Sequence, residues 1–309
     1  MRGSLKGRNF VSMRDVTHNE LAELIDTAAD LKRMARAGIP HASLPGKVLG
    51  LLFQKPSLRT RASFEVAMRH LGGSAVYMSP AEVGMGQREA VDDVAMVVSR
   101  YFDIICSRVF GHDIIEGLAE AATVPVINAL SDAEHPCQII ADLLTVKEWL
   151  GELEGLTMAY IGDGNNVAVS LAYGCAKVGM HFNIAAPEGY QLPQAVIDAF
   201  HEEAKDTGAT FFQTTAPEEA AKDCNAIYTD VWTSMGQEAE REARLKAFDG
   251  YLIDQRLVDL GDDAIVLHCL PAHYGEEITR DVSRSARSAI WDQAENRLHA
   301  HKSLLTLLA

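Results

Sequence analysis

The sequence predicts an α/β protein with two domains of similar size, each a parallel β-sheet flanked by helices. Short apolar runs bounded by turn residues recur along the chain, and helical patterns separate most of them. That alternation is typical of parallel sheets. The 309 residues also exceed the roughly 250–300 residues that one core usually organises. A fresh apolar run follows "EWLGELEGL" at 148–156, so we expect domains at 1–150 and 151–309.

Individual elements follow from local patterns. The stretch Thr17 to Glu20 fits a capping box, and helical apolar spacing follows it. A second helical pattern runs from Arg61 to Leu71. The predicted strands are the apolar runs at 47–53, 103–110, 124–128, 157–163, 181–187, 226–232 and 264–271. Ligands of open parallel sheets bind beyond the carboxyl ends of the strands, so the polar residues there are the candidates for function.

Composition excludes several classes of partner. The chain is 48% hydrophobic and 23% charged with a net charge of −15, which argues against a nucleic-acid or anionic-membrane surface. No apolar stretch approaches the roughly 20 residues of a membrane span, and "MRGSLKGRNF" lacks the apolar core of a signal peptide. The five cysteines are scattered without a CxxC pair, as expected of reduced thiols. We therefore expect a cytoplasmic protein.

The stretch "FQKPSLRTRASFE" at 53–65 gathers cations and hydroxyls in an acidic chain. Residues 57–61 lie at the predicted start of a helix, where unpaired N–H groups and the helix dipole favour phosphate. Arginine and hydroxyl side chains add charge-assisted donors. The alternative is a capped helix start with surface arginines, in which Arg61 pairs with Glu65 along the helix.

Two further polar stretches follow predicted strands. In "HPCQ" at 135–138, Pro136 suits the first turn of a helix, which places His135 and Gln138 at the N-terminus of that helix. Both side chains could hydrogen-bond a carbonyl oxygen, although His135 could instead cap the helix. "GDGNN" at 162–166 does not complete the glycine pattern of dinucleotide-binding turns, so NAD binding is not expected.

The last strands of the chain end in three more candidates. Asp230 in "DVWTSMG" could hold a cationic amine, or act only as a turn residue. Cys269 in "HCLP" emerges where ligands bind, or is a small buried hydrophobe. Arg297 in "AENRLH" lies on a predicted helix and could be a surface arginine. No spacing typical of covalent catalysis or metal binding is present, so we expect no metal and no cofactor.

Together, Phe-x-x-Pro-Ser-x-Arg-Thr-Arg and His-Pro-x-Gln resemble the carbamoyl-phosphate signature of the aspartate/ornithine carbamoyltransferase family. The resemblance covers essentially the whole chain. "GDGNN", "DVWTSMG", "HCLPA" and "AENRLH" are similar to the ornithine-using members, whereas aspartate-using members would carry a Pro-Leu-Pro-Arg-type motif in place of "HCLP".

The resemblance implies transfer of a carbamoyl group from carbamoyl phosphate to the δ-amine of L-ornithine. Arginine synthesis and arginine breakdown use the same chemistry, and we expect biosynthesis because it is the commoner role. It also implies that the C-terminal helix packs back on the first domain. The implied carbamoyl-phosphate residues are Ser57, Leu58, Arg59, Thr60, Arg108, His135, Gln138, Cys269, Leu270 and Arg297. The implied ornithine residues are Asn166, Asp230, Ser234 and Met235. Arg108, His135, Asp230 and Cys269 are the implied catalytic residues.

Two positions depart from the family pattern. The usual Ser-Thr-Arg-Thr-Arg has Leu58 in place of threonine, so only the N–H of this residue could donate to phosphate. "VGMGQRE" at 83–89 resembles the family loop that reaches a neighbouring subunit, which implies a homotrimer or a multiple of trimers. Gly84 stands there where many relatives have Gln or His, and Gln87 or Arg88 could substitute for it.

Alternative functions remain open from sequence. The acceptor could be N-acetylornithine, N-succinylornithine or putrescine instead of ornithine. The chain could also be a non-catalytic binding homologue, although the intact polar motifs argue against that. A nicotinamide-dependent oxidoreductase is disfavoured by the incomplete glycine pattern.

Overall fold

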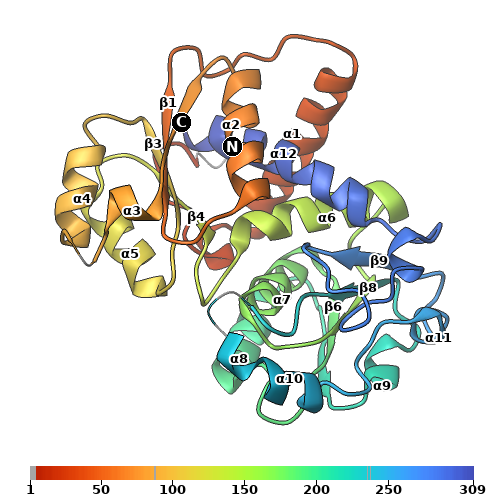
Figure 1. Ribbon diagram of the computed structural model, residues 1–309. Coiled ribbons are helices and arrows are strands. Elements are labelled where there is room, and N and C mark those ends of the chain that lie inside the picture. Colours follow the sequence, from red (N-terminus) through yellow and green to blue (C-terminus); the bar gives the residue numbers. More distant parts are fainter. Residues whose placement is uncertain (1–4, 87, 235, 237) are drawn as a thin grey trace. The chain divides into compact units, whose positions relative to one another are not determined.

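The computed structural model describes residues 5–86, 88–234, 236 and 238–309. The chain forms two compact units, one of residues 1–144 and 295–309 and one of residues 145–294. Each unit contains one parallel sheet flanked by helices (Figure 1). This architecture confirms the predicted α/β class.

The first unit has a four-stranded sheet in the order β2-β1-β3-β4. The strands are β1 (Val48–Phe53), β2 (Ser74–Met78), β3 (Ile104–Arg108) and β4 (Val126–Leu130), and all pairs are parallel. The accompanying helices are η1 (Met13–Asp15), α1 (His18–Arg36), α2 (Leu58–His70), α3 (Pro80–Val83), α4 (Val91–Val98), α5 (His112–Ala121) and α6 (Pro136–Leu150). Helix α1 begins with the predicted capping box, in which Thr17 Oγ1 accepts from Glu20 N–H.

The second unit has a five-stranded parallel sheet in the order β7-β6-β5-β8-β9. Its strands are β5 (Thr157–Ile161), β6 (His181–Ala185), β7 (Phe211–Thr214), β8 (Ala226–Thr229) and β9 (Ile265–His268). Its helices are α7 (Asn166–Val178), α8 (Gln194–Glu203), α9 (Pro217–Ala221), η2 (Glu238–Glu240), α10 (Arg241–Ala247), α11 (Gln255–Val258) and η3 (Val282–Arg284). Stacked rings of Trp232 and Phe248 lie in its core.

The C-terminal helix α12 (Ile290–Leu308) returns to the first unit, beside α1 and α2 (Figure 1). Lys32 Nζ donates to Asn296 Oδ1 at 2.7 Å, and Ser303 Oγ donates to the carbonyl of Leu24 at 2.7 Å. These bonds attach α12 to α1 on its buried face. The predicted packing of the last helix on the first part of the chain is therefore confirmed.

All seven predicted strands exist, with small differences at their ends. Strand β4 begins two residues later than predicted, after Pro125, which has no N–H for a ladder. The sequence analysis missed β2 and β7, which lie at the open edges of the two sheets. Both strands are partly exposed, so they lack the continuous apolar run that marked the others. The opposite edge strands, β4 and β9, are buried and were predicted.

The attachment of α12 can be tested with a pair of leucines on its last turns. Leu304 is fully buried and Leu307 is partly buried. We expect Leu304→Ala to lower the free energy of unfolding by ~2–5 kcal/mol, because a buried cavity is left behind. Leu307→Ala should cost clearly less. Denaturant unfolding of both variants measures the difference, and equal losses would contradict the described packing.

Candidate active site

The first group of site residues lies where β1 passes into α2. Ser57 is the N-cap of α2, and its Oγ accepts from the N–H of Thr60 at 3.3 Å. Leu58 and Arg59 form the first turn, and the Leu58 side chain is 81% exposed. Arg61 pairs with Glu65 at 2.8 Å, as the alternative interpretation of this arginine predicted. The helix start therefore presents N–H groups and hydroxyls together, with Arg59 beside them.

The neighbouring strands of the same sheet bring further polar residues to this edge. Arg108 ends β3 and pairs in register with Phe53, the last residue of β1. After β4, His135 directly precedes α6, which begins at Pro136 as predicted. Gln138 is fully buried, and its Nε2 donates to Asp142 Oδ1 at 2.8 Å. The Gln138 Oε1 atom has no hydrogen-bond partner among the described residues.

Helix α12 adds Arg297 to this group. Its Nη2 donates to Thr60 Oγ1 at 2.7 Å and the side chain is buried, so the alternative interpretation of Arg297 as a surface arginine is wrong. Burial lowers the pKa of His135 well below its usual value, and the positive charges of Arg297 and Arg108 lower it further. The group thus combines neutral imidazole with guanidinium donors.

Two residues that the sequence analysis did not select hold these loops together. Lys55 is buried, forms an ion pair with Asp132, and places its Nζ 4.4 Å from the centre of the Phe110 ring. The N–H of Gln54 donates to the carbonyl of Arg108 at 2.8 Å. Lysine next to Pro56 gave no distinctive pattern in the sequence, so only the fold reveals these contacts.

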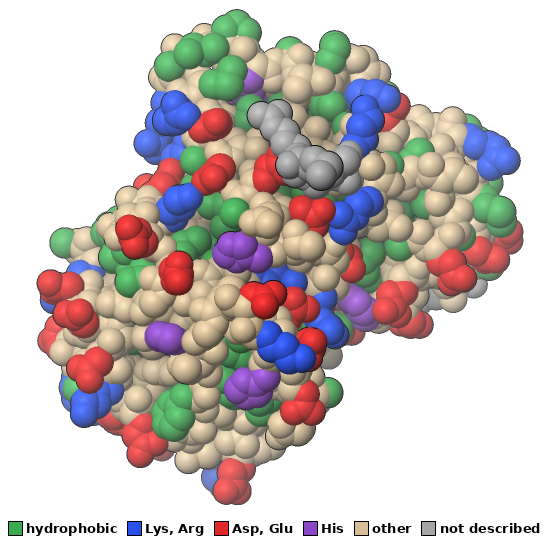
Figure 2. All heavy atoms as spheres, turned by 180° about the vertical axis from the view of Figure 1, so that it is seen from behind, with side chains coloured by type: hydrophobic (Ala, Val, Ile, Leu, Met, Phe, Trp, Pro, Cys, Tyr) green, Lys and Arg blue, Asp and Glu red, His purple; other side chains and the backbone are tan. Residues whose placement is uncertain are grey.

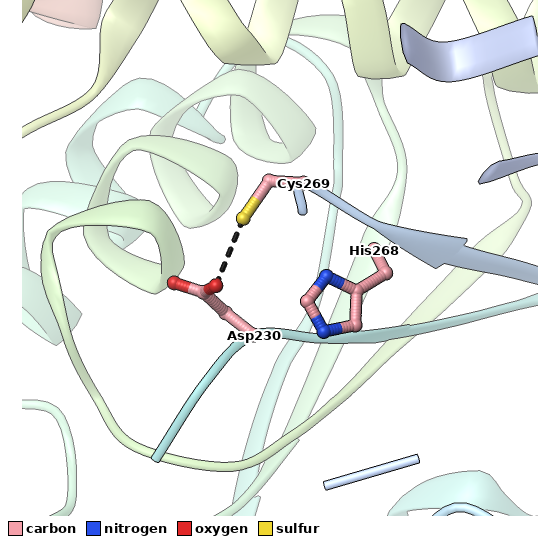
Figure 3. A group of neighbouring side chains, drawn as sticks. All are labelled: Asp230, His268 and Cys269. Carbon is pink, nitrogen blue, oxygen red and sulfur yellow. Dashed lines mark hydrogen bonds between the residues drawn. The ribbon is translucent and has the colours of Figure 1, made fainter. Parts of the chain in front are cut away.

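The second group lies in the other unit, at the carboxyl ends of β5, β8 and β9. Asp230 follows β8, and each of its carboxylate oxygens is held by a neighbour. Cys269 Sγ donates to Oδ1 at 2.9 Å, and Asn165 Nδ2 donates to Oδ2 at 3.1 Å. Figure 3 shows the sulfur of Cys269 pointing at the Asp230 carboxylate, with the His268 ring beside them. The structure therefore fixes the orientation of a buried carboxylate.

Asn165 and Asn166 were both expected to be polar groups of a cleft, but only Asn166 was assigned to ornithine, whereas Asn165 is the one that contacts Asp230. The Oδ1 of Asn165 caps α7 by accepting from the N–H groups of Val167 and Ala168, while its amide reaches Asp230. Asn166 is the first helical residue and is partly exposed. Asparagine is a preferred N-cap, and that preference could have identified the position.

The turn after β9 has an unusual backbone. Leu270 adopts a φ of 58°, in the left-handed region that side chains disfavour. Its N–H donates to His268 Nδ1 at 2.8 Å, which holds the turn in place. Of the remaining predicted residues, Ser234 is partly exposed, and Met235 lies outside the described residues.

The loop at 83–89 is described except for Gln87. Gly84 has a φ of 52°, and a Cβ there would lie 2.9 Å from Arg88 Cβ. The N–H of Arg88 donates to the Gly84 carbonyl at 2.7 Å. The close approach of Arg88 therefore explains why glycine occupies the position of the family's usual polar side chain.

The surface carries charged side chains of both signs (Figure 2). On the face drawn in Figure 2, Lys and Arg side chains are interspersed with Asp and Glu. Among the described helices, none is long and apolar enough to cross a membrane. A hollow of about 620 Å³ in the first unit is lined by Arg8, Asn9, Asp15, His112, Glu116 and others. None of the predicted site residues is among its lining residues.

Two groups of side chains within the described ranges are close enough to share a metal ion. One is Asp230, His268 and Cys269, and the other is His273, Glu276 and Glu277. In the first group, both ring nitrogens of His268 are already engaged, Nδ1 by Leu270 N–H and Nε2 by Glu277. That leaves Asp230 and Cys269, which are too few to form a typical site.

Comparisons with known proteins agree with this geometry. A family model described as the carbamoyl-P binding domain of aspartate/ornithine carbamoyltransferase matches residues 8–148, and one described as its Asp/Orn binding domain matches residues 154–308. A protein of Halalkalibacterium halodurans named ornithine carbamoyltransferase is 50% identical, covering 99% of this chain and 96% of its own. Another, from Pyrococcus furiosus and named anabolic, is 47% identical and is covered over 97% of its length.

Solved structures give the same result. The structure of ornithine carbamoyltransferase from Pyrococcus furiosus superposes with a TM-score of 0.96 at 47% sequence identity, covering 99% of this chain and 98% of that one. The enzyme of that name from Thermus thermophilus has a TM-score of 0.87 at 44% identity, covering 97% and 99%.

A buried imidazole next to the first group gives a pH prediction. His301 lies one turn after Arg297, stacks on Phe64 with ring centres 3.7 Å apart, and has no hydrogen-bond partner at either nitrogen among the described residues. Burial, and then the charge of Arg297, lower its pKa well below the usual value. The unfolded chain therefore takes up a proton near pH ~6.5 that the folded chain does not.

The stability contributed by neutral His301 is present above pH ~6.5 and is lost as the pH falls below it, by up to about 1.4 kcal/mol per pH unit. We expect His301→Gln to lose stability less steeply than the unmodified chain between pH 7.5 and 5. His201→Gln, at an exposed histidine, is the control. Denaturant unfolding across this range gives the slopes, and parallel slopes would contradict the buried neutral state.

Proposed function

We propose, since the chain belongs to the aspartate/ornithine carbamoyltransferase family, that it transfers the carbamoyl group of carbamoyl phosphate to the δ-amine of L-ornithine. The products are L-citrulline and phosphate. The observation that carries the proposal is the buried Asp230 carboxylate, with Cys269 and Asn165 fixing its two oxygens. Such a group suits a cationic amino-acid side chain, and relatives of 45–50% identity are named for ornithine.

The phosphate is assigned to the start of α2. The N–H groups of the first turn, the hydroxyls of Ser57 and Thr60, and the guanidinium of Arg59 are the donors. Phosphate binding at a helix N-terminus draws on both the unpaired N–H groups and the helix dipole. Arg297, held on Thr60, adds a second guanidinium to the same place. In this proposal residues 1–150 form the carbamoyl-phosphate-binding domain and residues 151–309 the ornithine-binding domain, and Cys269, Leu270 and Arg297 of the second range also serve carbamoyl phosphate.

The carbamoyl group is assigned to Arg108, His135 and Gln138. Neutral His135 can donate one N–H to the carbonyl oxygen, on which negative charge develops during attack. Arg108 bridges this oxygen and the phosphate. The carbamoyl NH₂ needs an acceptor, and Gln138 Oε1 is a buried acceptor without a partner among the described residues. Leu270, through its carbonyl, and Cys269 complete the carbamoyl-phosphate residues.

Ornithine is assigned to Asn166, Asp230, Ser234 and Met235. Its δ-amine, with an ordinary pKa near ~10.4, is protonated at neutral pH and must lose a proton before it can attack. Asp230 holds the amine, and Cys269 orients it. The δ-ammonium first releases one proton to solvent. The neutral nitrogen then bonds to the carbamoyl carbon, the bond from that carbon to the phosphate oxygen breaks, and the departing phosphate takes up the second proton that the nitrogen loses. Positioning and electrostatics supply the catalysis, since neither reactant is bonded to the enzyme.

We further propose a cytoplasmic homotrimer, or a multiple of trimers, that works in arginine biosynthesis. The loop at 83–89 and the relative named anabolic support this assignment. Since Gly84 has no side chain, a contact from this loop to a neighbouring subunit's carbamoyl phosphate falls to Arg88 or Gln87.

An acceptor panel tests the proposed reaction. Purified protein is given carbamoyl phosphate with ornithine, N-acetylornithine, N-succinylornithine, putrescine or aspartate, and the ureido product and phosphate are measured. We expect turnover with ornithine alone. Turnover with another acceptor would overturn the ornithine assignment but keep the carbamoyl-phosphate residues. No turnover with any acceptor would favour a binding homologue.

A pair of variants tests the division of residues between the two substrates. Arg59→Ala should raise the KM for carbamoyl phosphate by at least about tenfold, because a lost charge-assisted hydrogen bond costs ~1.5–3 kcal/mol. Asp230→Asn should lower kcat/KM for ornithine by a similar factor or more and change the KM for carbamoyl phosphate little. Steady-state kinetics with each substrate varied measures both. Equal effects of either variant on both substrates would contradict the assignment.

A further inference from the structure

The turn that follows Leu270 carries a group of side chains that the proposed reaction does not use. His273, Glu276 and Glu277 lie close together in the sequence. A ring nitrogen of His273 and one carboxylate oxygen of each glutamate lie within 4.8 Å of one another. The N–H of Glu276 donates to the His273 carbonyl at 2.9 Å, and the N–H of His273 donates to Glu277 Oε1 at 2.5 Å. The backbone therefore draws the three side chains together.

Glu277 is a fully buried acidic side chain, and no Lys or Arg among the described residues pairs with it. Its Oε1 accepts from His268 Nε2 at 3.0 Å. His268 Nδ1 accepts the N–H of Leu270 at 2.8 Å, so the N–H that this ring donates is at Nε2, toward Glu277 Oε1. Glu277 Oε1 thus receives two N–H donors, one from the His268 ring and one from the His273 backbone. An isolated buried carboxylate is costly unless a cation compensates it.

The remaining oxygens of the two carboxylates point to where that cation binds. Glu277 Oε2 and Glu276 Oε2 are both buried and have no hydrogen-bond partner among the described residues. His273 Nδ1 lies 3.8 Å from Glu276 Oε2, and the His273 side chain is 43% exposed, which leaves a path from solvent. Arg241 pairs with the other oxygen of Glu276 and so neutralises only one of the two acids.

We propose that His273, Glu276 and Glu277 bind a divalent transition-metal ion, and that this ion is Zn²⁺ in preference to Co²⁺. One imidazole nitrogen and two carboxylate oxygens are a ligand set that Zn²⁺ and Co²⁺ accept, with solvent in the remaining positions. The hydrogen bond from His268 to Glu277 Oε1 orients the carboxylate from behind, as outer-shell partners do in metal sites. The ion supplies the positive charge that buried Glu277 lacks.

Zinc binding to the full-length protein tests this site. Protein stripped with a chelator is dialysed against Zn²⁺, and bound metal and the thermal midpoint are measured. We expect one ion per chain and a raised midpoint, because an ion that binds only the folded state stabilises it. His273→Ala and Glu276→Gln should each weaken Zn²⁺ binding by at least about tenfold. His201→Ala, which removes an exposed histidine elsewhere in the same unit, should not.

A second pair of measurements separates this site from the sulfur of Cys269. Cys269→Ser should keep the Zn²⁺ affinity unchanged, and Co²⁺ bound to the unmodified protein should show no sulfur-to-cobalt charge-transfer band. Loss of binding in Cys269→Ser, or retention of full affinity in His273→Ala, would overturn the proposal. So would the absence of binding at about 1 mM Zn²⁺, which corresponds to only ~4 kcal/mol. Midpoints of metal-free variants confirm that each is folded.

Discussion

Parallel pairing of the strands is the constraint on which both groups of polar residues depend. Because β1, β3 and β4 run the same way in adjacent positions, their carboxyl ends place Ser57, Arg108 and His135 at one edge. The same rule in the other sheet brings Asp230 and Cys269 together after β8 and β9. Residues that are far apart in sequence therefore lie at the same edge because of the order and direction of the strands, which no local sequence pattern shows.

Burial then decides the charge that each group presents. The imidazole of His135 is neutral because removing it from water and placing it near two guanidiniums both oppose protonation. Asp230 accepts hydrogen bonds from a thiol and an amide, and neither donor is a cation, which is the arrangement that the proposed binding of a cationic amine requires. Arg244 and Asp163 contrast with this arrangement, since their buried ion pair at 2.6 Å leaves neither charge for a ligand.

The sequence was sufficient where one physical signal dominated. Buried strands appear in the sequence as apolar runs, and helix N-termini are marked by capping residues and prolines. Seven strands and the N-termini of α2 and α6 were therefore predictable. The edge strands β2 and β7 were not, because half-exposed residues give no such run. Lys55 and Arg297 were not recognisable as buried, since ion pairs and helix packing hide charges that composition assigns to the surface. The hydrogen bond that His268 Nδ1 accepts from Leu270 depends on the left-handed backbone of the turn after β9, which no sequence pattern indicated.

The difference between backbone and side-chain interactions explains how Leu58 can replace the family's threonine. Ser57 caps α2, and Thr60 Oγ1 accepts the hydrogen bond from Arg297 that joins α2 to α12. Neither interaction depends on the side chain at position 58. That side chain is 81% exposed and contributes little to folding. A helix N-terminus binds an anion through backbone N–H groups, which every residue except proline supplies. In the proposed phosphate site, position 58 is therefore constrained through its backbone, and its side chain is free to vary.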